Sequence, residues 1–404
     1  MKDSKEKSAY HGPYVSYKVS FFDLCDYSAG FYKCEMRGLY VMFTLISSCY
    51  ILISALTKFS KSGYYLETDF LELMLKDFKL VGLLWPGVFL YSWLAYFLQV
   101  MILKGMPIVL ANIYQHLSQT ITFVIAIYLS LTRDWSFTQV LFVSLLSCVH
   151  FMKMHSYTLV NRDLRALKQK NSEHSPYPSN INAANFLRFM ITPALVYQPV
   201  YPTYKEVRFD YIFKKLVLLM VQLAMIYIVV TDSILPVLHN SKDYTFTEIL
   251  VHLTIPCLIF ALMSFLVLFE QILNIFAELV KFADRSFYDD WWNSTTFEEF
   301  NRKWNRPVHL FLYKHVYSEC IVHYGLSKRV AQMTTFLFSA LLHEMIMALI
   351  IKQIKPVMLG FMMIQIPVIR YSRLFQKTVF GLYFYWFGII LGPPLILTIY
   401  AKSL

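Results

Sequence analysis

A histidine and a glutamate interrupt an apolar segment toward the C-terminus. His343 and Glu344 lie within the run from Phe336 to Ile351, whose other residues are nearly all apolar. Because an ionisable side chain is costly inside a membrane, such a pair commonly marks a functional site. A neutral imidazole can remove a proton from an alcohol at neutral pH, which makes His343 a candidate general base. Glu344 points about 100° away from it around a helix, so we expect Glu344 to pair elsewhere.

Asn305 is a second candidate catalytic residue. Its amide can donate a hydrogen bond to an oxygen on which negative charge develops, or hold an alcohol toward His343. The alternative is structural, because Asn is a good N-cap and the nearby Pro307 suits a first helical turn. A lone histidine in a membrane can likewise serve only to hydrogen-bond to a neighbouring helix. The presence of both residues in one chain favours chemistry over these structural roles.

A dense aromatic and acidic stretch, which we call the signature segment, precedes Asn305. It reads Phe287-Tyr288-Asp289-Asp290-Trp291-Trp292-Asn293. We expect the two tryptophans to lie at the membrane interface, where this side chain is enriched. The acidic residues and Asn293 are expected to bind backbone groups or basic partners. The segment is therefore predicted to brace the site more than to take part in the reaction.

Composition places the chain among membrane proteins. Of its 404 residues, 57% are hydrophobic and only 16% are charged, which is typical of a polytopic bundle. The net charge of +11 comes from short Lys and Arg clusters between apolar segments, as in cytoplasmic loops, so no nucleic-acid partner is expected. No zinc-ligand spacing is seen, and the six scattered cysteines indicate no disulfide framework.

Apolar segments of the right length predict an all-α polytopic fold. With a basic N-terminus in the cytoplasm, the most basic connections, after the fourth and sixth spans, also fall there, as the positive-inside rule requires. We expect a cytoplasmic, amphipathic N-terminal segment at residues 1–37 and one transmembrane catalytic domain at 38–404. The nine predicted spans are Gly38–Thr57, Leu80–Leu103, Pro107–Leu131, Phe137–Met154, Phe213–Val237, Ile249–Val280, Val330–Ile351, Pro356–Tyr371 and Val379–Tyr400.

The signature segment resembles the FYxDWWN motif of the membrane-bound O-acyltransferases, in the branch that acylates sterols and diacylglycerol. Trp304-Asn305 and His343 fall where that branch keeps its asparagine and its catalytic histidine. The segment Phe189 to Pro202 is similar to the family's Pro-x-Leu-x-Tyr segment. The resemblance is motif-specific over roughly residues 185 to 404 and rests on the pattern of apolar segments before that. It implies about nine helices around an intramembrane catalytic cavity.

The resemblance also implies a reaction. The segment from Trp304 to Tyr317 resembles fungal-type sterol O-acyltransferases. This resemblance implies transfer of a long-chain acyl group from acyl-CoA to the 3-hydroxyl of ergosterol or a cholesterol-like sterol. Acyl-CoA would be a co-substrate, with no further cofactor and no metal. The detail Pro307-Val308-His309 also occurs in diacylglycerol acyltransferases, so that activity is one alternative. A non-catalytic sterol-binding membrane protein is another.

Further expectations concern the oligomeric state, the cellular membrane and the residues that bind the coenzyme. The family implies a homodimer or higher homo-oligomer in the endoplasmic reticulum membrane, in contact with membrane lipid. Basic groups suit the phosphates of the coenzyme, although Arg302 and Lys328 are also explained as ordinary loop charges. The residues expected at acyl-CoA, by their spacing from Asn305 and His343, are Arg302, His309, Tyr317, Lys328 and Ser339.

Overall fold

The computed structural model describes the chain except residues 1–18, 24, 27–36, 66–67, 171–174 and 404. Most of the predicted N-terminal segment, 1–37, therefore lies outside the described residues. Within them every regular element is a helix, and the only β-type pairing is an isolated bridge between Thr203 and Phe282. The predicted all-α class is thus confirmed.

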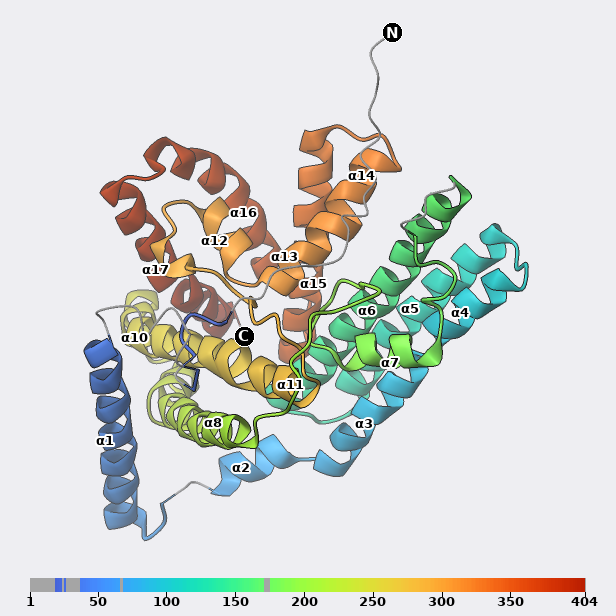
Figure 1. Ribbon diagram of the computed structural model, residues 1–404. Coiled ribbons are helices and arrows are strands. Elements are labelled where there is room, and N and C mark those ends of the chain that lie inside the picture. Colours follow the sequence, from blue (N-terminus) through green and yellow to red (C-terminus); the bar gives the residue numbers. More distant parts are fainter. Residues whose placement is uncertain (1–18, 24, 27–36, 66–67, 171–174, 404) are drawn as a thin grey trace. The chain divides into compact units, whose positions relative to one another are not determined.

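Each predicted span lies on one or more helices (Figure 1). Six helical segments among the described residues are long and apolar enough to cross a membrane: Phe70–Leu103, Phe137–Gln169, Phe209–His239, Phe246–Leu279, Lys328–Ile351 and Val379–Ser403. The three other predicted spans correspond to α1 (Arg37–Ser62), α5 (Ile108–Thr132) and α16 (Val357–Ser372). Nine crossings remain a prediction.

The described residues within 69–202 and 307–355 form a first compact unit. Its first helices are α3 (Phe78–Tyr91), α4 (Leu94–Leu103), α5, α6 (Phe137–Gln169) and α7 (Ala183–Ile191). After the second unit the chain returns through α13 (Arg306–Leu312), η5 (Tyr313–Tyr317), α14 (Ser318–Val322) and α15 (Lys328–Ile351). Helix α6 is central, because α3, α4, α5 and α15 all pack on it (Figure 1).

A buried lysine in the middle of α6 contacts the end of α7. The predicted span ended at Met154, yet the helix continues to Gln169. Lys153 is buried, and its Nζ donates hydrogen bonds to the backbone oxygens of Phe189 (2.9 Å) and Thr192 (2.7 Å) at the end of α7. A cation is stabilised at a helix C-terminus, where the last carbonyls lack helical partners. The lysine thereby fastens α7 to α6.

The described residues within 17–68, 203–306 and 356–404 form a second unit. Within it α10 packs against α17 and α8, and α16 packs against α17. Helix α2 (Thr68–Leu75) belongs to the first unit from Asp69 onward. Beyond α1 and α16 the main elements of the second unit are α8 (Phe209–Val229), η2 (Val230–Ile234), α9 (Leu235–His239), α10 (Phe246–Phe265), η3 (Leu266–Ile272), α11 (Leu273–Leu279), η4 (Trp291–Asn293), α12 (Phe297–Lys303), η6 (Arg373–Phe375) and α17 (Val379–Ser403).

A buried charge cluster holds the second unit together. Lys215 on α8 lies 2.9 Å from Asp23 and 3.1 Å from Glu270, and all three side chains are almost completely buried. Tyr211 also donates a hydrogen bond to Asp23 at 2.6 Å. Because an unpaired buried charge is strongly unfavourable, the lysine and the two carboxylates need one another. The short segment around Asp23 is thereby fixed to α8 and η3.

Candidate active site

His343 lies on α15 in the first unit, and its ring is exposed. Its Nδ1 is 2.8 Å from the backbone oxygen of Ser339, one turn earlier in the same helix. A carbonyl oxygen can only accept, so Nδ1 must carry the hydrogen. In the neutral ring Nε2 then keeps its lone pair, which is the form that a general base requires. The helix itself therefore sets the tautomer of this histidine.

The helix that carries His343 has defined ends. Ser327 caps its N-terminus, where its side chain accepts a hydrogen bond from the backbone nitrogen of Val330. At the other end Lys352 adopts a left-handed conformation with φ of 54°. Glu344, next to the histidine in sequence, is buried while His343 is exposed. This difference agrees with the expectation that the two side chains point in different directions.

Asn305 lies in the second unit, directly before α13. It is half-buried, and its place before the first residue of a helix is the one that an N-cap occupies. Asn305 and His343 belong to different units. Its predicted catalytic role, like that of His343, stays a prediction.

Four of the five residues predicted to bind acyl-CoA lie in the first unit. His309 and Tyr317 join one aromatic row through Tyr313, with ring centroids 6.5 Å and 5.7 Å apart. Ser339 meets His343 through its backbone, and Lys328 is the exposed first residue of α15. Helix α15 packs against η5, so the aromatic row and the histidine helix are neighbours.

The fifth predicted residue, Arg302, is exposed on α12 in the second unit. The sequence analysis missed Tyr313, the middle ring of the row. His309, Tyr313 and Tyr317 are spaced four residues apart, which places them on one helix face. This spacing could have identified Tyr313 from the sequence.

The signature segment packs as an aromatic cluster in the second unit. Trp291 is buried, and its ring centroid lies 4.9 Å from that of Trp304 and 5.1 Å from that of Phe265. Trp292 is half-buried and its ring lies 4.6 Å from that of Phe22, whereas Asn293 is exposed. Such aromatic pairs stabilise a fold beyond the area that they bury. Trp291 is therefore a core residue of its unit.

Polar groups of the signature segment bind partners, as the sequence analysis expected of its acids. Asp289 forms an ion pair with Arg306 at 3.0 Å, and Asp290 forms one with Lys303 at 3.1 Å. The hydroxyl of Tyr288 donates to the carboxylate of Glu270. Burial, together with that carboxylate, raises the pKa of Tyr288, so the hydroxyl keeps its proton and stays a donor. These contacts are consistent with the predicted structural role of the segment.

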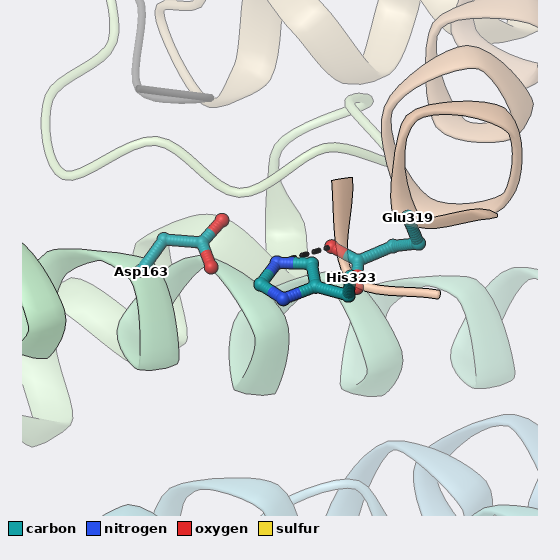
Figure 2. A group of neighbouring side chains, drawn as sticks. All are labelled: Asp163, Glu319 and His323. Carbon is teal, nitrogen blue, oxygen red and sulfur yellow. Dashed lines mark ion pairs between the residues drawn. The ribbon is translucent and has the colours of Figure 1, made fainter. Parts of the chain in front are cut away.

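Three possible metal ligands gather in the first unit: Asp163 on α6, Glu319 on α14 and His323 just beyond it (Figure 2). Their ligand atoms lie within 4.8 Å of one another. Arg162 already occupies this cluster, since its Nη2 is 2.9 Å from Asp163, 2.7 Å from Glu319 and 2.9 Å from the ring of His323. The guanidinium supplies the positive charge, and the cluster is accounted for as an ion-pair network that joins α14 to α6.

A polar pocket in the first unit was also missed. It has a volume of about 220 Å³ and lies between α4, α5, α6 and α14. His155 and Arg162 line it from α6, and His315 and Glu319 line it from the other side. Both pairs have helical spacing, of seven and four residues, which is the signal that could have found them. In the sequence these residues are separated by a long stretch of chain, so their meeting was not visible.

Comparison with known proteins defines the class. Residues 110–402 match the membrane-bound O-acyltransferase family, and the chain belongs to this family of acyltransferases. It is 30% identical to a probable sterol O-acyltransferase of Schizosaccharomyces pombe, over 97% of this chain and 86% of that protein. It is 37% identical to a sterol O-acyltransferase of Candida albicans over 61% of this chain, and 33% identical to a diacylglycerol O-acyltransferase of Glycine max over 67%. The chain covers 42% and 57% of these last two proteins.

Proposed function

We propose that this protein is a sterol O-acyltransferase, which transfers a long-chain acyl group from acyl-CoA to the 3-hydroxyl of a sterol. The observation that carries the proposal is the similarity to the fission yeast protein along almost the whole chain. The similarity to the diacylglycerol enzyme covers a smaller share of both chains. The position of His343, with its tautomer set by Ser339, supports the chemistry.

In the proposed reaction His343 acts as the general base. The sterol hydroxyl gives its proton to Nε2 while its oxygen attacks the thioester carbonyl of acyl-CoA. The carbon–sulfur bond then breaks, and the departing thiolate takes the proton from the imidazolium. The products are a steryl ester and coenzyme A, and no cofactor beyond the acyl-CoA substrate is required. The carbonyl of Ser339 accepts a hydrogen bond from Nδ1 throughout and stabilises the charged ring.

Asn305 is assigned the second role. Its amide donates a hydrogen bond to the thioester oxygen as negative charge develops there, or holds the sterol hydroxyl toward His343. His309, Tyr317, Lys328, Ser339 and Arg302 are proposed to contact the coenzyme. The signature segment acts indirectly, because its ion pairs with Lys303 and Arg306 stiffen the chain on both sides of Asn305.

The acceptor is tested with purified protein and labelled oleoyl-CoA. Ergosterol, cholesterol and diacylglycerol are supplied separately, and the lipid products and released thiol are measured. We expect steryl ester with a matching release of coenzyme A. Triacylglycerol without steryl ester would overturn the proposed acceptor in favour of diacylglycerol. Sterol binding without thiol release would instead support a non-catalytic sterol-binding protein.

We further propose that the protein acts in the endoplasmic reticulum membrane as a homo-oligomer with a cytoplasmic N-terminus. The charge of the connections between the predicted spans supports this orientation. A sterol reaches the site from the bilayer, whereas the polyanionic coenzyme stays at the aqueous surface. Cross-linking in intact membranes tests the oligomeric state, and a strictly monomeric product would contradict it.

A further inference from the structure

The residues that line the polar pocket of the first unit include one buried hydrogen-bond donor and one buried acceptor without a partner among the described residues. Arg165 lines it, and the buried Nη1 of this arginine has no hydrogen-bond partner among the described residues. Gln99 also lines it and is 1% exposed, and its Oε1 has no hydrogen-bond partner among the same residues. Because a buried polar atom without a partner is unfavourable, such atoms call for an explanation. One bound molecule with both an acceptor and a donor would satisfy them.

The charge around the pocket favours an anion at Arg165. The neighbouring Arg162 already donates to two carboxylates, those of Asp163 and Glu319. Arg165 has no such counter-ion in the described chain and remains the uncompensated cation of the pocket. A guanidinium binds phosphate oxygens with favourable geometry. A phosphate is therefore the group that best fits this side of the pocket.

The pocket continues into an apolar groove. Asn112 and His116 line both the pocket and a second, open hollow on the outer surface of α5. The apolar lining of the groove includes Val109, Ile113 and Leu117, which are 73%, 58% and 62% exposed. With a spacing of four residues they form one stripe along the helix. On a helix predicted to span the membrane, such a stripe faces acyl chains.

We propose that the first unit binds an aminophospholipid, with its head group in the pocket and one acyl chain along the groove of α5. The phosphate accepts hydrogen bonds from Arg165, and the primary ammonium donates to Gln99. The polar pocket, the rim that it shares with the groove and the apolar stripe follow one another in space. The head group, glycerol and acyl chain of such a lipid follow one another in the same order. The site is formed within the first unit alone. It is separate from His343, which does not line either hollow.

The test compares two lipids that differ only in the head-group amine. The purified full-length chain, stripped of lipid in detergent, is titrated with dioleoylphosphatidylethanolamine or dioleoylphosphatidylcholine, and binding is followed by native mass spectrometry. Phosphatidylcholine has the same phosphate and chains, but its trimethylated nitrogen donates no N–H hydrogen bond. We expect phosphatidylethanolamine to bind roughly fivefold more tightly. Equal affinity for the two lipids would overturn the proposal.

Variants locate the binding. Arg165→Gln should weaken binding of both lipids roughly tenfold, because it removes a charged hydrogen bond to the phosphate. Gln99→Leu should abolish the preference between them. Lys168→Gln, an exposed basic residue on the same helix, is the matched control and should bind as the parent does. Val109→Ser lies on the exposed groove, leaves the pocket intact and should weaken both lipids. It therefore keeps the test decisive if Arg165→Gln does not fold.

Coenzyme A provides the remaining arm of the experiment, because it also carries phosphates and an amine. Added without lipid and then in competition, it should leave bound phosphatidylethanolamine in place. Displacement of the lipid by coenzyme A would assign the pocket to the co-substrate and overturn the lipid site. Unchanged lipid binding in Arg165→Gln would also overturn the lipid site, since the phosphate would then lie elsewhere.

Discussion

The carbonyl of Ser339 determines what His343 can do chemically. Its 2.8 Å contact with Nδ1 leaves Nε2 as the basic atom of the neutral ring. The sequence predicted the histidine from its unusual place in an apolar segment. It also selected Ser339, but as one of the residues expected to contact acyl-CoA. The backbone interaction could not be predicted, since it depends on the rotamer of the histidine.

We expect His343→Ala to lower the rate of acyl transfer by roughly 10²- to 10⁴-fold, the usual contribution of a general base. Release of free thiol from oleoyl-CoA in the presence of sterol measures it. His252→Ala, which changes an exposed histidine on α10, should keep the parent rate. A fully active His343→Ala with normal thermal unfolding would refute the general-base role.

Lys215 is a residue on which the stability of the second unit depends. Removing its charge in Lys215→Met leaves Asp23 and Glu270 buried together without a cation. We expect a loss of stability of about 3–5 kcal/mol, typical of breaking a buried ion pair from one side. Thermal unfolding in detergent, followed by tryptophan fluorescence, measures it.

The neighbouring Lys214 supplies the control for Lys215. It forms only an exposed ion pair with Asp210 one turn earlier. Lys214→Met should therefore leave the unfolding temperature unchanged, because exposed pairs contribute little. Similar unfolding temperatures for the two methionine variants would contradict the role given to the buried cluster.

At the scale of elements, hydropathy predicted where helices lie better than where they end. The Leu80–Leu103 span is in fact two helices, α3 and α4, separated at Ser92 and Trp93. Helix α6 continues to Gln169, past its predicted end at Met154, and Lys153 in its middle contacts the backbone at the end of α7. Neither result is encoded in local composition. Contacts between residues far apart in sequence, such as Asp23 with Lys215, are likewise invisible until the chain is folded.

Helix α17 offers a test of close packing. A Cβ at Gly381 would lie 2.2 Å from the backbone oxygen of Phe375 and 3.0 Å from that of Thr295. Backbone atoms cannot move aside cheaply, so Gly381→Ala should destabilise the protein by about 1–3 kcal/mol, as overpacking does. The same thermal unfolding measurement applies.

Gly360 on α16, which packs against α17, is the control, because apart from its chain neighbours nothing lies within 4 Å of its added Cβ. Gly360→Ala should unfold at the same temperature or slightly higher, since alanine is the better helix former. Equal destabilisation by both substitutions would show that helix flexibility, and not the contact with Phe375, limits stability at this position.

At the scale of the whole molecule, membership of the acyltransferase family was predictable from a few short motifs. The signature segment, Asn305 and His343 carried it, and the family match over residues 110–402 confirms it. The polar pocket was not predictable, because it joins residues of α4 to α6 with His315 and Glu319 from much later in the chain. The exact number of crossings also depends on α1, α5 and α16, which are not among the six described segments long and apolar enough to cross a membrane.

Glycan mapping tests the orientation of the whole chain. An Asn-Ser-Thr acceptor with short flexible flanks, inserted after Ser241, should be glycosylated, because this connection is predicted to lie in the lumen. The same insertion after Lys170 should stay unmodified. The chain provides its own control, since Asn293-Ser294-Thr295 is an acceptor sequence with an exposed asparagine on the predicted cytoplasmic side. A shift in mass at Asn293 would reverse the orientation.

The backbone origin of the hydrogen bond to His343 has a consequence for mutagenesis. Nearly any amino acid at position 339 would present the same carbonyl, so a substitution there keeps the tautomer that the proposed general base requires. Under the proposed mechanism, a substitution at residue 339 therefore leaves the general base intact, whereas a substitution of His343 removes it.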